Sequence, residues 1–170
     1  MIEDRDSSST IARSIRHRGF PKDIQEPFRL FDDDLTLKSH LMYHKAKAGV
    51  KEAAVGLISD LAIDFIVRIK DKLPKNAIFV APHAREATGD NAIPQVFAAM
   101  CAMVAQGEVD TDIVQATRVF HTGADPMERM RSRPEFDGSV TKGANYVLVD
   151  DVMNMGGTLA ELSSYILEAG

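Results

Sequence analysis

The sequence has little of what several protein classes require. It contains no tryptophan and a single cysteine, Cys101, so an internal disulfide is excluded. Cys101 stands in the apolar stretch FAAMCAMVAQ, which is typical of a buried, unreactive thiol. No apolar run approaches the ~20 residues that a membrane-spanning helix needs, and the N-terminus has no signal-peptide core. We therefore expect a soluble, cytoplasmic protein with no membrane partner.

Positive charge is also scarce. The chain has 20 Lys and Arg against 25 Asp and Glu, a net charge of −5 and a pI of about 5.5, which argues against nucleic acid as a partner. Its 170 residues are enough for one domain with a buried core. We predict a flexible, Ser- and Arg-rich arm over residues 1–25 and a single α/β domain over residues 26–170.

Hydrophobic periodicity predicts strands that alternate with helices, a pattern that favours a parallel sheet flanked by helices. Between them, a long polar connection is expected over 121–143, and short extended segments over 26–37 with a turn at Asp32–Asp34. The predicted helices cover residues 50–72, 94–107 and 158–169, and the predicted strands cover 77–82, 146–151 and part of 112–120.

The stretch YVLVDDVMNMGGT combines features that suit a ligand. Asp150 and Asp151 stand at the carboxyl end of the predicted strand, where parallel sheets bind their ligands. Gly156, Gly157 and Thr158 then begin a helix, whose first amides can hold a phosphate. Carboxylates accept hydrogen bonds from vicinal hydroxyls, so the combination suits a sugar phosphate. The G-x-G-x-x-G and P-loop signatures are absent, since Thr158 rather than Lys follows Gly157.

VLVDDVMNMGGT resembles the phosphoribosyl-pyrophosphate (PRPP) signature of the type I phosphoribosyltransferases. The resemblance covers residues 40–170: FVAPHAREATGDNAIP falls at the family's pyrophosphate loop, and RSRPEFDG resembles the end of its catalytic loop. It implies a parallel α/β fold with an N-terminal hood, in a chain that stops before the family's last strand. The implied reaction transfers the phosphoribosyl group of PRPP to a nitrogen nucleophile, a nucleobase, and releases pyrophosphate.

The resemblance also implies roles for individual residues. Asp150 and Asp151 would bind the ribose hydroxyls, and Mg²⁺, held mainly through PRPP, would lie near them. A homodimer is usual for the family, and PRPP and a nucleobase-like acceptor would be the partners. The 5′-phosphate would be held by Asn154, Met155, Gly156, Gly157 and Thr158. The pyrophosphate would be held by His83, Ala84 and Arg85. The candidates for a catalytic arginine are Arg85, Arg129 and Arg131, with Arg118 and Arg133 as further candidates.

Two other functions stay open. Asn154 cannot act as a base and Met155 lacks a hydroxyl often present in the family, which favours a non-catalytic PRPP- or nucleotide-binding regulatory module. FDDDLT matches the D-x-D-x-T signature of haloacid-dehalogenase-like phosphatases, with Asp32 as the nucleophile and Asp34 as the acid.

Two histidines have the spacing of metal ligands. His40 and His44 lie four apart on a predicted helix, but no third ligand is indicated. We therefore interpret them as surface or partly packed residues.

Overall fold

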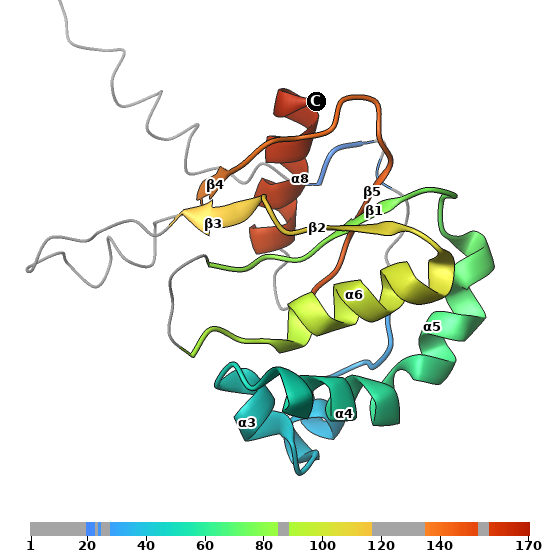
Figure 1. The fold of residues 1–170 in the computed structure, drawn as a ribbon, viewed down its shortest axis with the longest axis vertical. Helices are drawn as coiled ribbons and strands as arrows, with labels where there is room; N and C mark the ends of the chain where they lie inside the picture. Colours follow the sequence, from blue (N-terminus) through green and yellow to red (C-terminus); the bar gives the residue numbers. More distant parts are fainter. Residues whose placement is uncertain (1–19, 23, 25–27, 85–88, 117–134, 153–156) are drawn as a thin grey trace, which may run out of the picture.

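The protein is described here by a computed structural model, which covers residues 20–22, 24, 28–84, 89–116, 135–152 and 157–170 (Figure 1). Its centre is a three-stranded parallel sheet in the order β2-β1-β5. The strands are β1 (Ile78–Val80), β2 (Glu108–Asp110) and β5 (Tyr146–Leu148). Two of them lie within the predicted strands, and the parallel pairing confirms a mixed α/β fold.

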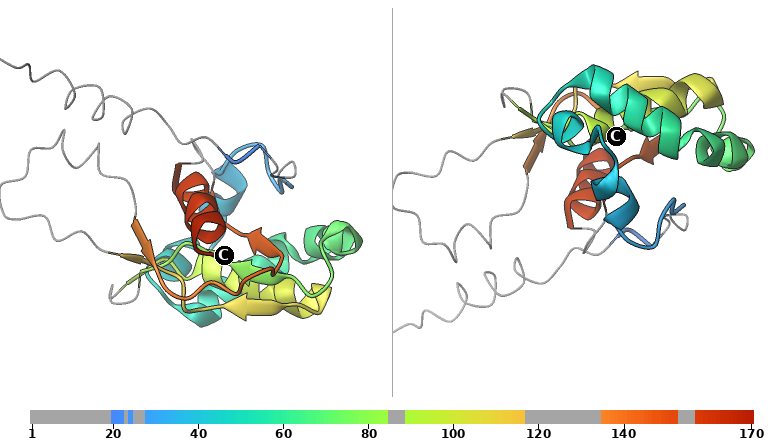
Figure 2. Two further views of the ribbon diagram at one scale, coloured as in Figure 1. Left: turned by 90° about the horizontal axis from the view of Figure 1, so that it is seen from above. Right: turned by 90° about the horizontal axis from the view of Figure 1, so that it is seen from below.

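Helices cover both faces of this sheet (Figures 1 and 2). On one face, α6 (Ile93–Ala105) packs on β1 and β2, and α4 (Lys51–Leu61) packs on α6. On the other face lies α8 (Gly157–Ala169), which contacts β5. Side chains that alternate along the strands supply both cores: Phe79 packs with the α6 side and Val80 with the α8 side. α6 and α8 each begin and end within two residues of the predicted positions.

A smaller antiparallel sheet pairs β3 (Val114–Ala116) with β4 (Glu135–Asp137). The sequence predicts a strand near β3. It predicts a polar connection where β4 forms, which is wrong, and it predicts no element where β2 forms. Both missed strands carry one apolar residue between two acids, Val109 in β2 and Phe136 in β4. Such a short pattern has too little alternation to be distinguished from a loop.

The predicted helix over 50–72 is divided in two. α4 ends at Leu61 and α5 (Ile63–Ile69) follows, with a 3₁₀ turn at Lys70–Lys72. Ala62, between them, has φ −121° and is fully buried. The sequence has no proline or glycine there to predict the break. The break instead allows α5 to pack against the core. Before Pro74 the chain becomes extended at Leu73, as predicted.

The segment before α4 differs from the expectation. Within residues 28–37 the structure has no strand, because α2 (Leu35–Ser39) begins there. The Leu35 amide donates to Asp33 Oδ1 at 2.9 Å, and Lys38 pairs with Asp34 one turn later, which stabilises a helix start instead of an extended segment.

The end of α6 shows why its glycine is needed. Gln106 adopts the left-handed conformation (φ 56°) and terminates the helix one residue before Gly107, within the range predicted as helix. A Cβ on Gly107 would lie 2.5 Å from the Ala77 carbonyl oxygen and 2.7 Å from the Phe79 ring. Gly107 therefore allows β1 and the α6–β2 turn to approach closely.

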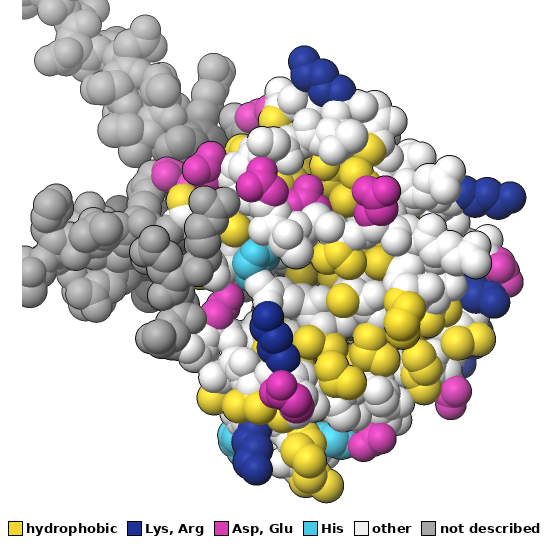
Figure 3. All heavy atoms as spheres, in the orientation of Figure 1, with side chains coloured by type: hydrophobic (Ala, Val, Ile, Leu, Met, Phe, Trp, Pro, Cys, Tyr) yellow, Lys and Arg dark blue, Asp and Glu magenta, His cyan; other side chains and the backbone are white. Residues whose placement is uncertain are grey.

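The outer surface of α6 is apolar. None of the helix's 13 residues is charged, and Met103 is 69% exposed. Figure 3 shows hydrophobic side chains gathered over α6 and its neighbours. Within the described residues, no helix is long and apolar enough to cross a membrane.

Candidate functional site

The carboxyl ends of β1 and β5 bring the predicted site residues to one edge of the sheet. Asp150 and Asp151 follow β5, and His83 and Ala84 follow β1, because parallel strands end at the same edge. Val147 and Val149 face the α6 side, whereas Tyr146 and Leu148 face the α8 side.

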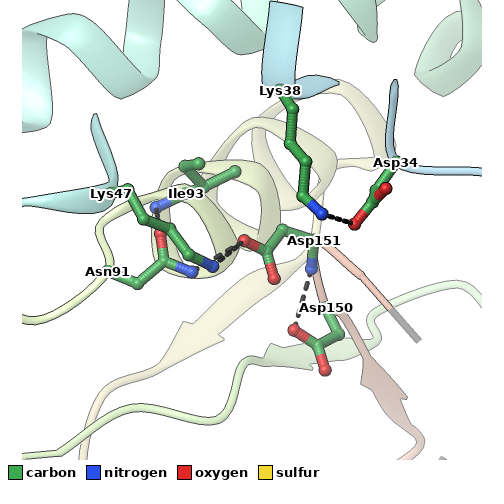
Figure 4. A network of polar contacts seen from close by, with 7 residues as sticks. All are labelled: Asp34, Lys38, Lys47, Asn91, Ile93, Asp150 and Asp151. Atoms are coloured by element: carbon green, nitrogen blue, oxygen red, sulfur yellow. Dashed lines mark hydrogen bonds and ion pairs between the residues drawn. The ribbon is translucent and has the colours of Figure 1, made fainter. Parts of the chain in front are cut away.

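Asp151 is held by two side chains from distant parts of the chain (Figure 4). Lys47 Nζ, at the end of α3 (Tyr43–Lys47), lies 3.0 Å from Asp151 Oδ2. Asn91 Nδ2 donates to the same oxygen at 2.7 Å. The Asp151 side chain is 6% exposed, so a buried carboxylate has both a counter-ion and a neutral donor.

Asn91 is itself oriented by the start of α6. Its Oδ1 accepts a hydrogen bond from the Ile93 amide at 3.2 Å, so its Nδ2 is directed to Asp151. Neither Lys47 nor Asn91 is predicted as a site residue from the sequence. Lys47 is 104 residues from Asp151, and no local pattern predicts that contact.

Asp150, the other member of the acid pair, has a raised pKa. Burial, followed by the side-chain hydrogen bond and the charge of Asp151, raises the pKa of Asp150 to about 7, while the charge of Lys47 opposes the shift. The Asp151 amide also donates to Asp150 Oδ1 at 2.8 Å. Near neutral pH the pair therefore combines a partly protonated Asp150 with an Asp151 paired to Lys47.

The loop after β1 uses some of its polar groups internally. His83 Nδ1 lies 3.0 Å from the Ala81 carbonyl oxygen, and the His83 carbonyl accepts from the Gln115 amide at 2.7 Å. The Ala84 amide, a predicted pyrophosphate donor, donates to Asp90 Oδ2 at 3.1 Å. A ligand at this amide would therefore have to displace Asp90.

A cavity of about 340 Å³ opens beside this loop. His83, Ala84 and Asp90 line it together with Lys51 and Thr111, whereas Asp150 and Asp151 do not. His83 and Ala84 thus lie at the same edge of the sheet as Asp150 and Asp151, but the acid pair does not line this cavity.

Gly157 and Thr158 lie in the first turn of α8, as the phosphate prediction requires. Gly157 has no left-handed φ, and a Cβ there would meet no described atom within 4 Å. Neither local conformation nor packing among the described residues explains this glycine. The other predicted residues lie outside the described ranges: Arg85, Arg118, Arg129, Arg131, Arg133, Asn154, Met155 and Gly156.

The alternative sites have simpler surroundings. Asp32 and Asp34 lie in a bend before α2, and not after a strand as the phosphatase signature requires. His40 ends α2 and pairs with Asp60 at 3.1 Å, while His44 belongs to α3, so the prediction of one helix carrying both is wrong. Within the described ranges, no group of three His, Cys, Asp or Glu side chains suits a metal ion.

Cys101 is buried, as its apolar setting predicts. Burial raises the pKa of its thiol to about 12, so the thiolate form is disfavoured.

The fold and site define a mixed α/β protein whose parallel sheet places an acid pair at its carboxyl edge. No protein-family model matches the chain. It is 42% identical over 132 residues to an uncharacterized protein of Haemophilus influenzae, covering 76% of this chain and 30% of that protein. It is 39% identical over 130 residues to Protein TraN of Escherichia coli, covering 75% of this chain and 29% of that protein. The chain therefore spans less than a third of the length of these relatives.

Proposed function

We propose that this chain binds PRPP and transfers its phosphoribosyl group to a nitrogen nucleophile, a nucleobase, with release of pyrophosphate. The observation that carries the proposal is Gly157, an otherwise unexplained glycine at the start of α8, the helix that follows the acid pair in the sequence. A glycine with open space at a helix start is what a phosphate needs to reach the backbone amides. Asp150 and Asp151 stand where ribose hydroxyls would be bound.

The roles of the residues follow from charge. Asp150 and Asp151 would accept hydrogen bonds from the ribose hydroxyls and orient the sugar. The first amides of α8, with the Thr158 hydroxyl, would hold the 5′-phosphate. His83, Ala84 and Arg85 would receive the pyrophosphate, which leaves as the ribose develops positive charge.

Mg²⁺, held mainly through PRPP, would lie near Asp150 and Asp151, because carboxylate oxygens are ligands that it prefers. Bound Mg²⁺ would supply positive charge to the departing pyrophosphate. Arg129 or Arg131 would add a guanidinium to the same phosphate oxygens.

A thermal melt with Mg²⁺ and saturating PRPP tests binding. PRPP at ~100 times its dissociation constant adds roughly 2.7 kcal/mol, a rise of roughly 5–10 °C for this size. Asp150→Asn/Asp151→Asn should lose the rise. Asp32→Asn/Asp33→Asn is a matched control at another pair of adjacent aspartates, and it should keep the rise. No rise in the wild-type protein would refute the proposal.

A second candidate is a regulatory module that binds PRPP without consuming it, which the residues Asn154 and Met155 favour. Release of pyrophosphate, measured with a panel of nucleobases, separates the two. Binding of PRPP without pyrophosphate release for any base would favour the regulatory module.

A further inference from the structure

Two adjacent carboxylates disfavour the binding of a ligand with several negative charges. PRPP carries a phosphate and a pyrophosphate, and adjacent aspartates would repel both groups if each carboxyl were ionised and unpaired. An acid pair that recognises a sugar phosphate therefore needs positive charge close by.

The described residues supply that charge at one point (Figure 4). Lys47 Nζ lies 3.0 Å from Asp151 Oδ2. The neighbouring Lys38 pairs with Asp34 at 2.5 Å, so its charge is directed elsewhere. The Lys47 side chain is 42% exposed, whereas that of Asp151 is 6% exposed. The carboxylate is thus fixed within the protein while part of the lysine remains open to solvent.

Asn91 and Lys47 act differently on the same oxygen. Asn91 donates from 2.7 Å and its other end is held by Ile93, so it sets the direction of Asp151 without changing the charge. Lys47 alone of these two brings a positive charge. Removing that charge would leave Asp151 as a buried carboxylate with no ion pair to another residue that the structure describes.

We propose that Lys47 is a positioning residue that decides ligand class: by neutralising Asp151 it lets the acid pair accept anionic sugar phosphates. This inference rests on the proposed function. The ligands it favours carry a vicinal diol, which the aspartates bind, and one or more phosphates, which the pair would otherwise repel. The benefit from Lys47 grows with the number of phosphate charges on the ligand, which a merely structural contact would not do.

Calorimetric titration of PRPP and ribose 5-phosphate into Lys47→Gln tests this. Glutamine keeps a hydrogen-bond donor and removes the charge. Because the Lys47 side chain is 42% exposed, the expected loss of PRPP affinity lies at the low end for a charge pair, roughly 30–100-fold, and the loss for ribose 5-phosphate should be several-fold smaller. Lys47→Arg should restore PRPP binding to near the wild-type value, because guanidinium keeps the charge.

Lys45→Met is the matched control. Lys45 lies on the same helix, is exposed and has no ion pair with a described residue. Its loss removes the same net charge from the protein, so an effect of overall charge would appear in both variants. We expect unchanged affinities for Lys45→Met.

Three outcomes would overturn the inference. Lys47→Gln could lose the same affinity for both ligands, or it could bind PRPP as well as the wild-type protein. Lys45→Met could lose as much affinity for PRPP as Lys47→Gln does. Failure of the wild-type protein to bind either ligand would instead refute the proposed function. Each variant is first melted without ligand; if Lys47→Gln is unfolded, the salt dependence of the two wild-type affinities decides. It should differ between PRPP and ribose 5-phosphate, and equal dependence would overturn the inference.

Discussion

The two faces of the central sheet differ in how much core they carry. On the α6 side, 20 of the described residues form one buried cluster that includes Leu57, Ile66 and Phe79. On the α8 side, the buried cluster consists of Val80, Ile113, Leu162 and Ile166. The α6 side therefore holds most of the hydrophobic stabilisation, while α8, which begins with the proposed phosphate site, contributes Leu162 and Ile166 to the smaller cluster. A ligand at that site would add its free energy to the less heavily packed face.

The largest expected effect is the loss of stability when a buried leucine on either face of the sheet is replaced by alanine. Leu57 and Leu162 are both fully buried. Leu57→Ala should lower the free energy of unfolding by about 3–5 kcal/mol, because its large cluster cannot collapse around the cavity. Leu162→Ala should cost about 2–3 kcal/mol, since its partners are few and partly exposed. Urea denaturation measures both, and equal losses would show that the faces are equally rigid.

A glycine from each face gives the next comparison. Gly107→Ala would press a methyl group on the Ala77 carbonyl and the Phe79 ring, and it should cost about 1–3 kcal/mol. Gly157→Ala meets no described atom, so stability should stay the same or rise by up to about 1 kcal/mol. PRPP binding should nevertheless weaken in Gly157→Ala, as titration would reveal. A variant that binds PRPP as well as the wild-type protein would leave this glycine without the proposed role.

The raised pKa of Asp150 predicts that the free energy of unfolding depends on pH. The pKa of Asp150 is raised from 3.8 to about 7 in the folded protein. Its contribution to stability is therefore complete below about pH 4 and is lost as the pH rises through about 7. Asp150→Asn, which stays neutral, should be more stable than the wild-type protein at pH 8 by up to about 4 kcal/mol, because each unit of pKa shift corresponds to about 1.4 kcal/mol. Denaturation at several pH values should show this difference shrink toward pH 4; a difference independent of pH would contradict the raised pKa.

The smallest effect is expected on the α8 side. The Tyr165 hydroxyl donates to the Gly138 carbonyl oxygen at 2.5 Å and connects α8 to the segment after β4. Tyr165→Phe removes this hydrogen bond and keeps the ring beside Phe136, so it should cost about 1 kcal/mol. Thermal melts measure the loss, and a loss as large as that of Leu57→Ala would mean that α8 depends on this bond.

Continuous apolar stretches and helical periodicity were enough to predict β1, β5, α6 and α8. β2 and β4 were missed because Val109 and Phe136 each stand alone between two acids, and pairing with a neighbouring strand, not local pattern, makes them strands. The break at Ala62 could not be predicted, because no proline or glycine stands at that position. The tertiary packing of α5 decides that position.

The position of the acid pair was predictable, but its surroundings were not. A strand followed by Asp150 and Asp151 places both carboxyls at the carboxyl end of a parallel sheet. Which side chains reach them depends on how α3 and the start of α6 pack, so Lys47 and Asn91 could not be predicted. The use of the Ala84 amide by Asp90 is likewise a property of the folded loop.

The parallel pairing of β1 with β5 has a consequence for the order of folding. Ile78 pairs with Tyr146, and Lys47 reaches Asp151 across 104 residues. The entropy of closing such long loops must be overcome before these contacts add any stability, which slows their formation. The acid pair should therefore be assembled late during refolding, after the more local helical contacts of α3, α4 and α6. A ligand that binds the assembled pair should act mainly by slowing unfolding, and it should change the refolding rate little.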